Sequence, residues 1–320
     1  MAVYTEVPDG ELSAFVAQYD LGETVACKGI AEGVENSNFL LQTTFGSYIL
    51  TLYEKRVARE DLPFFLGLME HLAAKGMNCP TPIKARDGQA LHELCGRPAV
   101  IVSFLEGMWP RRPTERHCQM LGSALADLHL KGRDFTLTRA NALSIAGWHK
   151  LVDATKDRAD EVEPGLGKTI TGELAFLDAN WPKDLEIGVI HADLFPDNVF
   201  FLNDRLSGVI DFYFACTDFL AYDLAVCINA WCFEPDHSLN VTKTRLMVQS
   251  YNATRPIPPA ELAALPILAR GSALRFLLTR LYDWLNHPPG AFVKPKDPKE
   301  YLRKLRFHQA ATTAAAYGIG

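Results

Sequence analysis

The first hundred residues alternate short apolar runs with polar or glycine-containing turns, a pattern that predicts a sheet with one helix. Two of the runs flank the turn at residues 45–47 and should pair as a hairpin. Between Asp61 and Lys75 apolar residues recur at helical spacing, and Gly76 ends that helix. Extended runs are expected at residues 25–30, 39–41, 48–53 and 98–105.

Beyond residue 106 the apolar positions follow a mainly helical period. Helices are expected at residues 114–131, 148–180, 224–232, 243–251, 261–286 and 299–308. Residues 187–212 interrupt this pattern with β-prone runs, and the small-residue tail after residue 309 is expected to fray. The sequence therefore predicts an α+β protein, with a β-rich part over residues 1–105 and a mainly helical part over residues 106–320.

Composition and charge narrow the class of protein. Apolar residues make up 48% and charged residues 22%, as in an ordinary globular protein. A net charge of -6 argues against the basic surface of a nucleic-acid binder, so no nucleic-acid partner is expected. No apolar run approaches the roughly 18 residues of a membrane span, and the start MAVYTEVPDG has no signal-peptide features. We therefore expect a cytoplasmic protein without a membrane partner, whose seven cysteines are reduced thiols without metal-ligand spacing.

The segment that carries chemistry is HADLFPDN, followed by the run VIDFY. Phosphoryl transfer needs a carboxylate that orients the attacking hydroxyl and accepts its proton, and oxygen ligands that hold Mg²⁺ against the phosphates. Asp193 and Asn198 have the separation of the base and the metal-binding amide in H-x-D-x-x-x-x-N, and Asp211 ends the next β-run. One carboxylate and one amide are the protein ligands expected for this hard cation.

A predicted hairpin strengthens this interpretation. The β-runs at residues 199–202 and 206–210 can pair as a hairpin, which would place Asn198 and Asp211 at adjacent strand ends. The alternative is that the polar residues are ordinary loop and strand-cap positions. The combined spacing, the apolar flanks and the Asp-Phe pair favour the catalytic interpretation.

These segments resemble the signature of the aminoglycoside phosphotransferase and choline kinase superfamily, and within it the bacterial homoserine kinases. The resemblance is carried by GIAEGVENSNFLL, YILTLYE, DLPFFLGLMEHL, GRPAVIVSFLEG, HADLFPDNVFF and IDFYFACTDFLAYDLAVCINAWC, which cover most of the chain. It implies a bilobal protein-kinase-like fold, with a small antiparallel-sheet N-lobe (1–105) for the nucleotide and a larger, mainly helical C-lobe (106–320) for catalysis and the acceptor. It also implies ATP and Mg²⁺ as cofactors, and phosphorylation of the L-homoserine side-chain hydroxyl in threonine biosynthesis.

The resemblance assigns roles to individual residues. Asp193 is the expected base, Asn198 and Asp211 are the expected Mg²⁺ ligands, and His191 and Asp223 are expected to support the catalytic loop. For Asp223 the alternative is a simple helix N-cap. The residues assigned to nucleotide binding are Gly33, Asn36, Ser37, Asn38, Ser103 and Leu105. The first four lie in the loop where the phosphate-covering loop belongs, for which a plain hairpin loop is the alternative; the last two lie at the interlobe hinge.

One position departs from the family pattern. The third strand usually presents a Lys or Arg to the phosphates, but here the equivalent position in YILTLYEKR is Thr51. Lys55 at the strand end is a substitute candidate, with a surface lysine as the alternative. Glu70 on the following helix is the candidate acidic partner, with an exposed helix carboxylate as the alternative.

The acceptor pocket has two candidate residues. A zwitterionic amino acid needs a donor for its α-carboxylate, and the planar guanidinium of Arg275, in an apolar helix, suits that task. Tyr213, directly after Asp-Phe, is a candidate for the pocket wall. Residues 212–320 hold more basic than acidic side chains, which favours a carboxylate-bearing acceptor over choline, ethanolamine, methylthioribose or an aminoglycoside. A catalytically dead nucleotide-binding module is the alternative from another class.

Overall fold

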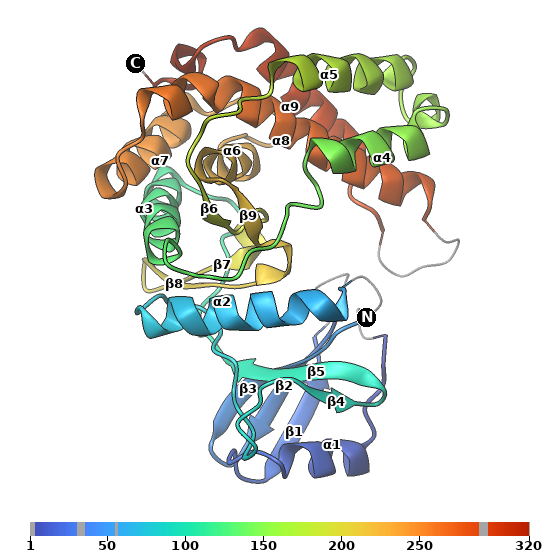
Figure 1. The fold of residues 1–320 in the computed structure, drawn as a ribbon, viewed down its shortest axis with the longest axis vertical. Helices are drawn as coiled ribbons and strands as arrows, with labels where there is room; N and C mark the ends of the chain where they lie inside the picture. Colours follow the sequence, from blue (N-terminus) through green and yellow to red (C-terminus); the bar gives the residue numbers. More distant parts are fainter. Residues whose placement is uncertain (1–3, 31–35, 55–56, 288–293, 320) are drawn as a thin grey trace. The chain divides into compact units, whose positions relative to one another are not determined.

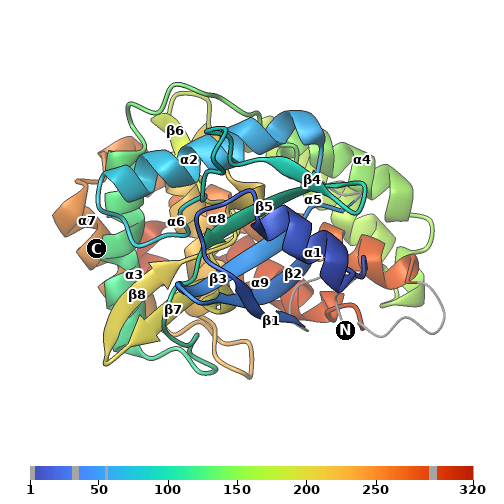
Figure 2. The ribbon, with the colours of Figure 1, turned by 90° about the horizontal axis from the view of Figure 1, so that it is seen from below.

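The computed structural model describes residues 4–30, 36–54, 57–287 and 294–319. This part of the chain divides into two compact units, whose ribbons are drawn in Figures 1 and 2. Unit 1 comprises Met1–Gly107 with Ser207–Tyr213, and unit 2 comprises Met108–Leu206 with Phe214–Gly320. The predicted α+β fold class is confirmed, with an antiparallel sheet in unit 1 and mainly helices in unit 2.

A five-stranded antiparallel sheet with the order β1-β2-β3-β5-β4 is the centre of unit 1. Its strands are β1 (Thr24–Gly29), β2 (Ser37–Thr43), β3 (Gly46–Leu52), β4 (His92–Leu94) and β5 (Arg97–Ser103). The hairpin expected around residues 45–47 is confirmed as β2 and β3, whose register pairs Asn38 with Thr51. The predicted helix over residues 61–75 is α2 (Leu62–Ala74), preceded by the short η1 (Arg59–Asp61).

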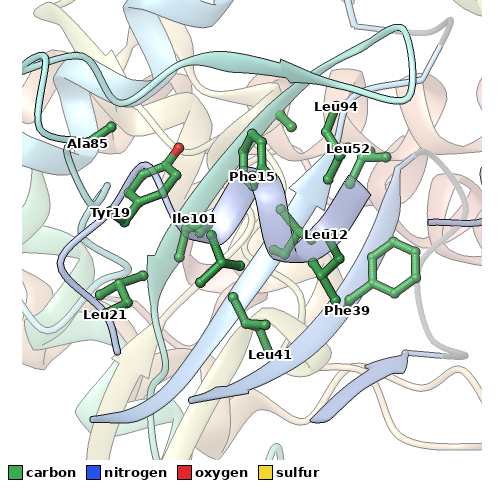
Figure 3. Close-up of a cluster of buried hydrophobic side chains, with 13 residues drawn as sticks. Leu12, Phe15, Tyr19, Leu21, Phe39, Leu41, Leu52, Ala85, Leu94 and Ile101 are labelled. Carbon is green, nitrogen blue, oxygen red and sulfur yellow. The ribbon is translucent and has the colours of Figure 1, made fainter. Parts of the chain in front are cut away.

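Helix α1 (Asp9–Val16) completes the core of unit 1 and is not predicted by the strand-and-turn pattern. Its apolar side chains Leu12 and Phe15 are directed at the sheet, where Leu41 and Ile101 meet them (Figure 3). All four are at most 3% exposed, and burying each such side chain contributes about 1.5–3 kcal/mol. Because α1 has only eight residues, its helical period is too short to stand out in the sequence.

Unit 2 is built from seven α-helices, 3₁₀ turns and short strand pairs, counted over the described residues. The helices are α3 (Glu115–Lys131), α4 (Ile145–Thr155), α5 (Leu166–Asn180), α6 (Leu220–Trp231), α7 (Val241–Thr254), α8 (Pro259–Leu285) and α9 (Pro298–Ala310). The predicted helical stretch over residues 148–180 is divided into α4 and α5 by residues 156–165, at the end of which Pro164 and Gly165, with a φ of 81°, precede the first turn of α5. The 3₁₀ turn η2 (Ala159–Glu161) lies in the interruption.

Two strand pairs flank the motif segment. β6 (Ile187–Ile190) pairs with β9 (Cys216–Phe219), a strand that the sequence did not predict. β7 (Val199–Leu202) and β8 (Arg205–Val209) form the expected hairpin, and the chain passes from unit 2 to unit 1 within β8. The 3₁₀ turns η3 (Pro196–Asn198) and η4 (Phe212–Phe214) precede and follow this hairpin.

Helix α8 is the central helix of unit 2, in contact with α4, α5, α6 and α9. By length and composition alone it could cross a membrane, but 67% of its most apolar window is buried inside the structure. Burial in the core therefore accounts for its apolar composition. The expectation that the C-terminal tail frays is wrong: η5 (Ala314–Tyr317) is ordered, and the fully buried hydroxyl of Tyr317 lies 2.7 Å from Nδ1 of His308.

Candidate active site

The predicted catalytic loop follows β6 in unit 2 and has an unusual backbone conformation. Ala192 has a φ of 63°, in the left-handed region that disfavours side chains with a Cβ. Such a conformation costs about 1–3 kcal/mol and persists only where the surroundings impose it. Neighbouring His191 is completely buried, and its Nδ1 accepts a 3.3 Å hydrogen bond from the backbone N–H of Asp193.

The buried carboxylate of Asp223 imposes this conformation. From the first turn of α6, its two oxygens accept the backbone N–H groups of His191 at 2.7 Å and Ala192 at 2.8 Å. Burial alone would favour the protonated form of Asp223, but the hydrogen bonds from His129 and the loop backbone favour the ionised form. The carboxylate therefore stays ionised and accepts both bonds as a charged group.

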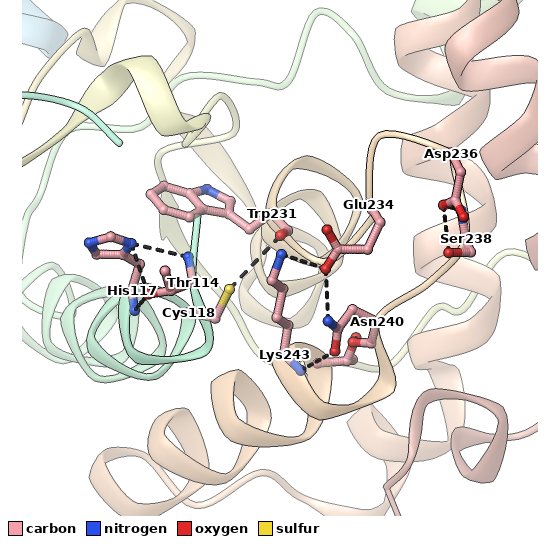
Figure 4. A network of polar contacts seen from close by, with 10 residues as sticks. Thr114, His117, Cys118, Trp231, Glu234, Asp236, Ser238, Asn240 and Lys243 are labelled. Carbon is pink, nitrogen blue, oxygen red and sulfur yellow. Dashed lines mark hydrogen bonds and ion pairs between the residues drawn. The ribbon is translucent and has the colours of Figure 1, made fainter. Parts of the chain in front are cut away.

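Two more side chains fix the part of the loop that carries Asp193 and Asn198. The Asn198 amide donates to the Asp193 carbonyl at 2.8 Å and lies 3.5 Å from its carboxylate oxygen Oδ2. The indole N–H of Trp231, at the end of α6, donates to the Leu194 carbonyl at 2.7 Å. Figure 4 shows Trp231 beside Cys118, whose thiol donates to the Trp231 carbonyl. Asp193 is thus presented by a loop that is held on both sides.

The predicted acceptor residue Arg275 lies against the same loop. Its guanidinium donates to the Ala192 carbonyl and lies over the ring of Phe276, with its carbon 4.5 Å from the ring centre. Arg275 is 2% exposed, and among the described residues no carboxylate lies within 4 Å of it and its Nε has no hydrogen-bond partner. Arg275 therefore forms no ion pair with the described residues.

In unit 1, the side chains of the expected phosphate loop bond to their own neighbours. Ser37 Oγ accepts the backbone N–H of Tyr4 at 2.8 Å and donates to Glu54 at 2.7 Å. Asn36 accepts the backbone N–H of Glu54 at 3.3 Å. Both of these side chains are buried, and their hydrogen bonds are made within unit 1.

Thr51 stands where the family usually has a lysine or arginine, and it forms a hydrogen bond between uncharged side chains. Thr51 is buried, and its hydroxyl donates to Asn38 at 2.7 Å across the β2–β3 pair. Glu70, the candidate acidic partner, lies 3.3 Å from Lys84, and both side chains are at least one-third exposed. Lys55 and Gly33 lie outside the described residues.

The remaining predicted site residues also lie in unit 1. Ser103 ends β5, where its hydroxyl accepts the backbone N–H of Thr81 at 2.9 Å, and Leu105 follows two residues later. Tyr213 packs edge-on against Tyr53, whose hydroxyl donates to it at 3.3 Å; burial raises the pKa of Tyr213 to about 12. Asp211, two residues after β8, has a φ of 65°.

The structure can be tested for its fit to Mg²⁺. Among the described residues no group of three His, Cys, Asp or Glu side chains is arranged to hold a metal ion. A nucleotide-bound Mg²⁺ needs fewer protein ligands, because phosphate and water oxygens complete its shell. The Asn198 amide uses its Nδ2 for the two bonds to Asp193, which directs its other end, the hard oxygen Oδ1, to a different partner. Asn198 therefore fits the role of a Mg²⁺ ligand.

Residues 26–256 match the phosphotransferase enzyme family, and the chain belongs to that family. It is therefore an ATP-dependent small-molecule kinase by class. It is 64% identical over 325 residues to a homoserine kinase of Paramagnetospirillum magneticum, with all of both chains covered. A homoserine kinase of Xanthobacter autotrophicus is 65% identical over 319 residues, covering 100% of this chain and 99% of that one.

Solved structures with low sequence identity share the fold. An amicoumacin kinase in complex with AMP-PNP and Ca²⁺ has a TM-score of 0.71 at 13% identity, covering 96% of this chain and 94% of that one. A choline kinase from Cryptosporidium parvum has a TM-score of 0.69 at 13% identity, covering 95% of each chain. The kinase-like architecture expected from the sequence is confirmed by these similarities.

Sequence reasoning missed two residues that hold the loop, Trp231 and His129. The indole N–H of Trp231 reaches the loop from the end of α6, and no sequence motif marks this residue. His129 Nε2 lies 3.2 Å from Asp223, 94 residues further along the chain. A histidine on the apolar face of the predicted helix over residues 114–131 was the available signal, because a buried imidazole requires partners.

Proposed function

We propose that this protein transfers the γ-phosphoryl group of ATP to the side-chain hydroxyl of L-homoserine, giving ADP and O-phosphohomoserine. The observation that carries the proposal is the identity of about two-thirds to homoserine kinases from several bacteria over the full length of the chain. This step would place the protein in threonine biosynthesis, in the cytoplasm, without a nucleic-acid or membrane partner. Choline, ethanolamine, methylthioribose and aminoglycosides are the competing acceptors.

In the proposed reaction Asp193 is the base. Its carboxylate orients the homoserine hydroxyl and accepts the hydroxyl proton while the oxygen attacks the γ-phosphorus and the bond to the β-phosphate oxygen breaks. The loop bonds described above limit the positions that Asp193 can take, so the hydroxyl is held near its line of attack. His191 and Asp223 support the loop without touching the reacting atoms.

Mg²⁺ would be held by Asn198 and Asp211 together with the phosphates, and when bound it neutralises charge on the β- and γ-phosphate oxygens. Support for Asn198 comes from its amide oxygen Oδ1, which accepts no hydrogen bond from the described residues because the amide binds Asp193 through Nδ2. Support for Asp211 comes from its place after the β7–β8 hairpin and from its left-handed backbone, since non-glycine residues in that conformation cluster at functional sites.

For the nucleotide we propose backbone contacts from the loop that contains Gly33, Asn36, Ser37 and Asn38, and adenine contacts at Ser103 and Leu105. The buried hydrogen bonds of Ser37 and Asn36 give the loop after Gly33 a fixed anchor at the start of β2. Thr51 and Asn38 supply no cation, so more of the phosphate charge would be met by Mg²⁺ and by backbone N–H groups than in relatives with a lysine there.

For the acceptor we propose that Arg275 meets the α-carboxylate and that Tyr213 forms part of the pocket wall. A buried guanidinium with no carboxylate partner among the described residues is costly, and a bound carboxylate would offset that cost. Arg275→Lys keeps the charge and loses the fork, so the KM for homoserine should rise about tenfold or more while the KM for ATP is unchanged. A fall in kcat alone would assign Arg275 to loop support through Ala192.

The acceptor assignment is tested by ADP formation across a panel of homoserine, choline, ethanolamine, methylthioribose and kanamycin. The proposal predicts that kcat/KM for homoserine exceeds every other value by at least about 10²-fold, because a site built for a carboxylate and an ammonium leaves buried polar groups unpaired with the other acceptors. A higher value for any other acceptor would replace homoserine in the proposal.

A further inference from the structure

A line of buried polar side chains leads from the catalytic loop into the interior of unit 2. It begins at Asp223 on α6, continues through His129 on α3 and Tyr251 on α7, and ends at Arg255, which follows α7. Each of the four is at most 1% exposed. Burying four such groups is costly unless they bond to one another, so their arrangement has a structural reason.

The direction of each hydrogen bond in this line follows from what its atoms can donate. The Asp223 carboxylate only accepts, so the Nε2 of His129, 3.2 Å away, carries a proton. Tyr251 places its hydroxyl oxygen 2.7 Å from Nδ1 of His129 and 3.2 Å from Nη1 of Arg255. A guanidinium only donates, so the Tyr251 proton cannot be directed at Arg255.

His129 Nδ1 therefore accepts the hydrogen bond that the Tyr251 hydroxyl donates, since the described residues offer this hydroxyl no other acceptor. It follows that His129 is neutral and protonated at Nε2 alone. A proton on Nδ1 would leave the Tyr251 hydroxyl facing donors on both sides. Burial raises the pKa of Tyr251, which keeps its proton in place.

Arg255 also ties down the start of the strand that leads into the catalytic loop. Its guanidinium binds both carboxylate oxygens of Glu261, at 2.7 and 2.8 Å, and donates to Glu186 at 2.6 Å. Glu186 is the residue before β6, and β6 ends at the residue before His191. One buried guanidinium is thus bonded to one end of β6 through Glu186 and to the other through Tyr251 and its partners.

We propose that Tyr251 and Arg255 are positioning residues for phosphoryl transfer. By fixing His129 as the neutral Nε2–H tautomer, they prevent an ion pair between His129 and Asp223. The Asp223 carboxylate then accepts the N–H groups of the catalytic loop with its full negative charge. They touch neither substrate. The proposal rests on the proposed function, because its kinetic effect is read in the reaction with homoserine.

The first experiment is Tyr251→Phe, which removes the hydroxyl and keeps the ring. Losing one hydrogen bond that acts through the loop should lower kcat by about threefold to tenfold, with both KM values unchanged. Tyr317→Phe is the matched control, because the Tyr317 hydroxyl also lies 2.7 Å from Nδ1 of a buried histidine, His308, but the Nε2 of that histidine faces Asn229 instead of Asp223. It should lower the melting temperature similarly and leave kcat within about twofold.

The second experiment reads the tautomer directly and needs no acceptor. In ¹⁵N-histidine-labelled full-length protein, with the signals of residue 129 identified by their loss in His129→Gln, Nδ1 should be unprotonated and Nε2 protonated. A protonated Nδ1 would overturn the proposal. So would a Tyr251→Phe enzyme that keeps kcat within about twofold of wild type. If homoserine proves not to be the acceptor, the proposed function fails while the tautomer result stands on its own.

Arg255→Lys keeps the inference testable if Tyr251→Phe does not fold. Lysine retains the charge but cannot bond to Glu261, Glu186 and Tyr251 together, so kcat should fall by at least about threefold. Arg270→Lys is its control, because Arg270 forms a comparable two-oxygen pair with Glu173 away from the catalytic loop. Equal kcat in the two lysine variants would contradict the positioning role of Arg255.

Discussion

The Asp223 carboxylate accepts the backbone N–H of Ala192 at 2.8 Å and thereby holds that residue at a φ of 63°. Asp223→Asn keeps the size of the side chain but presents an NH₂ group to one of the two loop N–H groups. We expect a loss of about 1–3 kcal/mol in unfolding free energy and a fall in kcat of at least about tenfold. Denaturant unfolding and steady-state kinetics measure the two. Asp178→Asn, which alters a part-exposed pair with His149, should change neither.

The role of Asp193 predicts a kinetic defect confined to the chemical step. Asp193→Asn should lower kcat by about 10²–10⁴-fold, the usual contribution of a positioned base, with little change in the KM for ATP. Steady-state kinetics with both substrates checks this. A variant that keeps more than about a tenth of the wild-type kcat would remove Asp193 from the role of base.

The proposed Mg²⁺ ligands predict a graded metal requirement. Asn198→Ala and Asp211→Ala should both raise the Mg²⁺ concentration needed for half-maximal rate, and Asp211→Ala should do so more strongly, because a carboxylate supplies charge and an amide only a dipole. Asp197→Ala is the control, since that side chain is 52% exposed and lies next to Asn198 in the chain. Unchanged Mg²⁺ titrations for Asp211→Ala would show that the metal assignment is wrong.

A buried histidine outside the catalytic loop predicts acid sensitivity. Burial, and then the charges of Lys304 and Arg270, lower the pKa of His308 to about 3, against about 6.5 in an unfolded chain. Between these pH values the unfolded state binds a proton that the folded state does not. The unfolding free energy is therefore highest above pH 6.5 and falls as the pH drops toward 3. The loss from pH 7 to pH 5 should be about 2 kcal/mol.

This loss is measured by chemical denaturation at the two pH values, with His308→Gln as the comparison. The variant lacks the titrating group, so its stability should change by about 2 kcal/mol less than that of the wild type over the same range. An equal change in the two proteins would mean that other groups cause the acid sensitivity.

Much of the architecture could be predicted because its elements carry long or clearly alternating patterns. The β2–β3 hairpin, α2, α3 and the four helices beyond residue 220 lie within a few residues of the predicted bounds. Helix α1 and strand β9 were missed because eight and four residues give too few repeats of a period. The ordered tail was missed because the bond between Tyr317 and His308 is a tertiary contact that small-residue composition does not reveal.

The candidate site likewise has a part that could be predicted from the sequence and a part that could not. The spacing of Asp193 and Asn198 is local, so the motif could be identified from the sequence alone. The groups that hold this loop are distant in the chain: Trp231 follows Leu194 by 37 residues, and His129 precedes Asp223 by 94. Only folding brings such pairs together, and a single sequence carries no signal of which buried polar residues will meet.

The most direct test of the proposed reaction is the identity of its product. Purified protein incubated with ATP, Mg²⁺ and L-homoserine should give O-phosphohomoserine, seen as a phosphate-monoester signal by ³¹P NMR and formed in equal amount with ADP, and Asp193→Asn should form it at least about 10²-fold more slowly. ADP without O-phosphohomoserine, or equal product formation by the Asp193→Asn variant, would contradict the account.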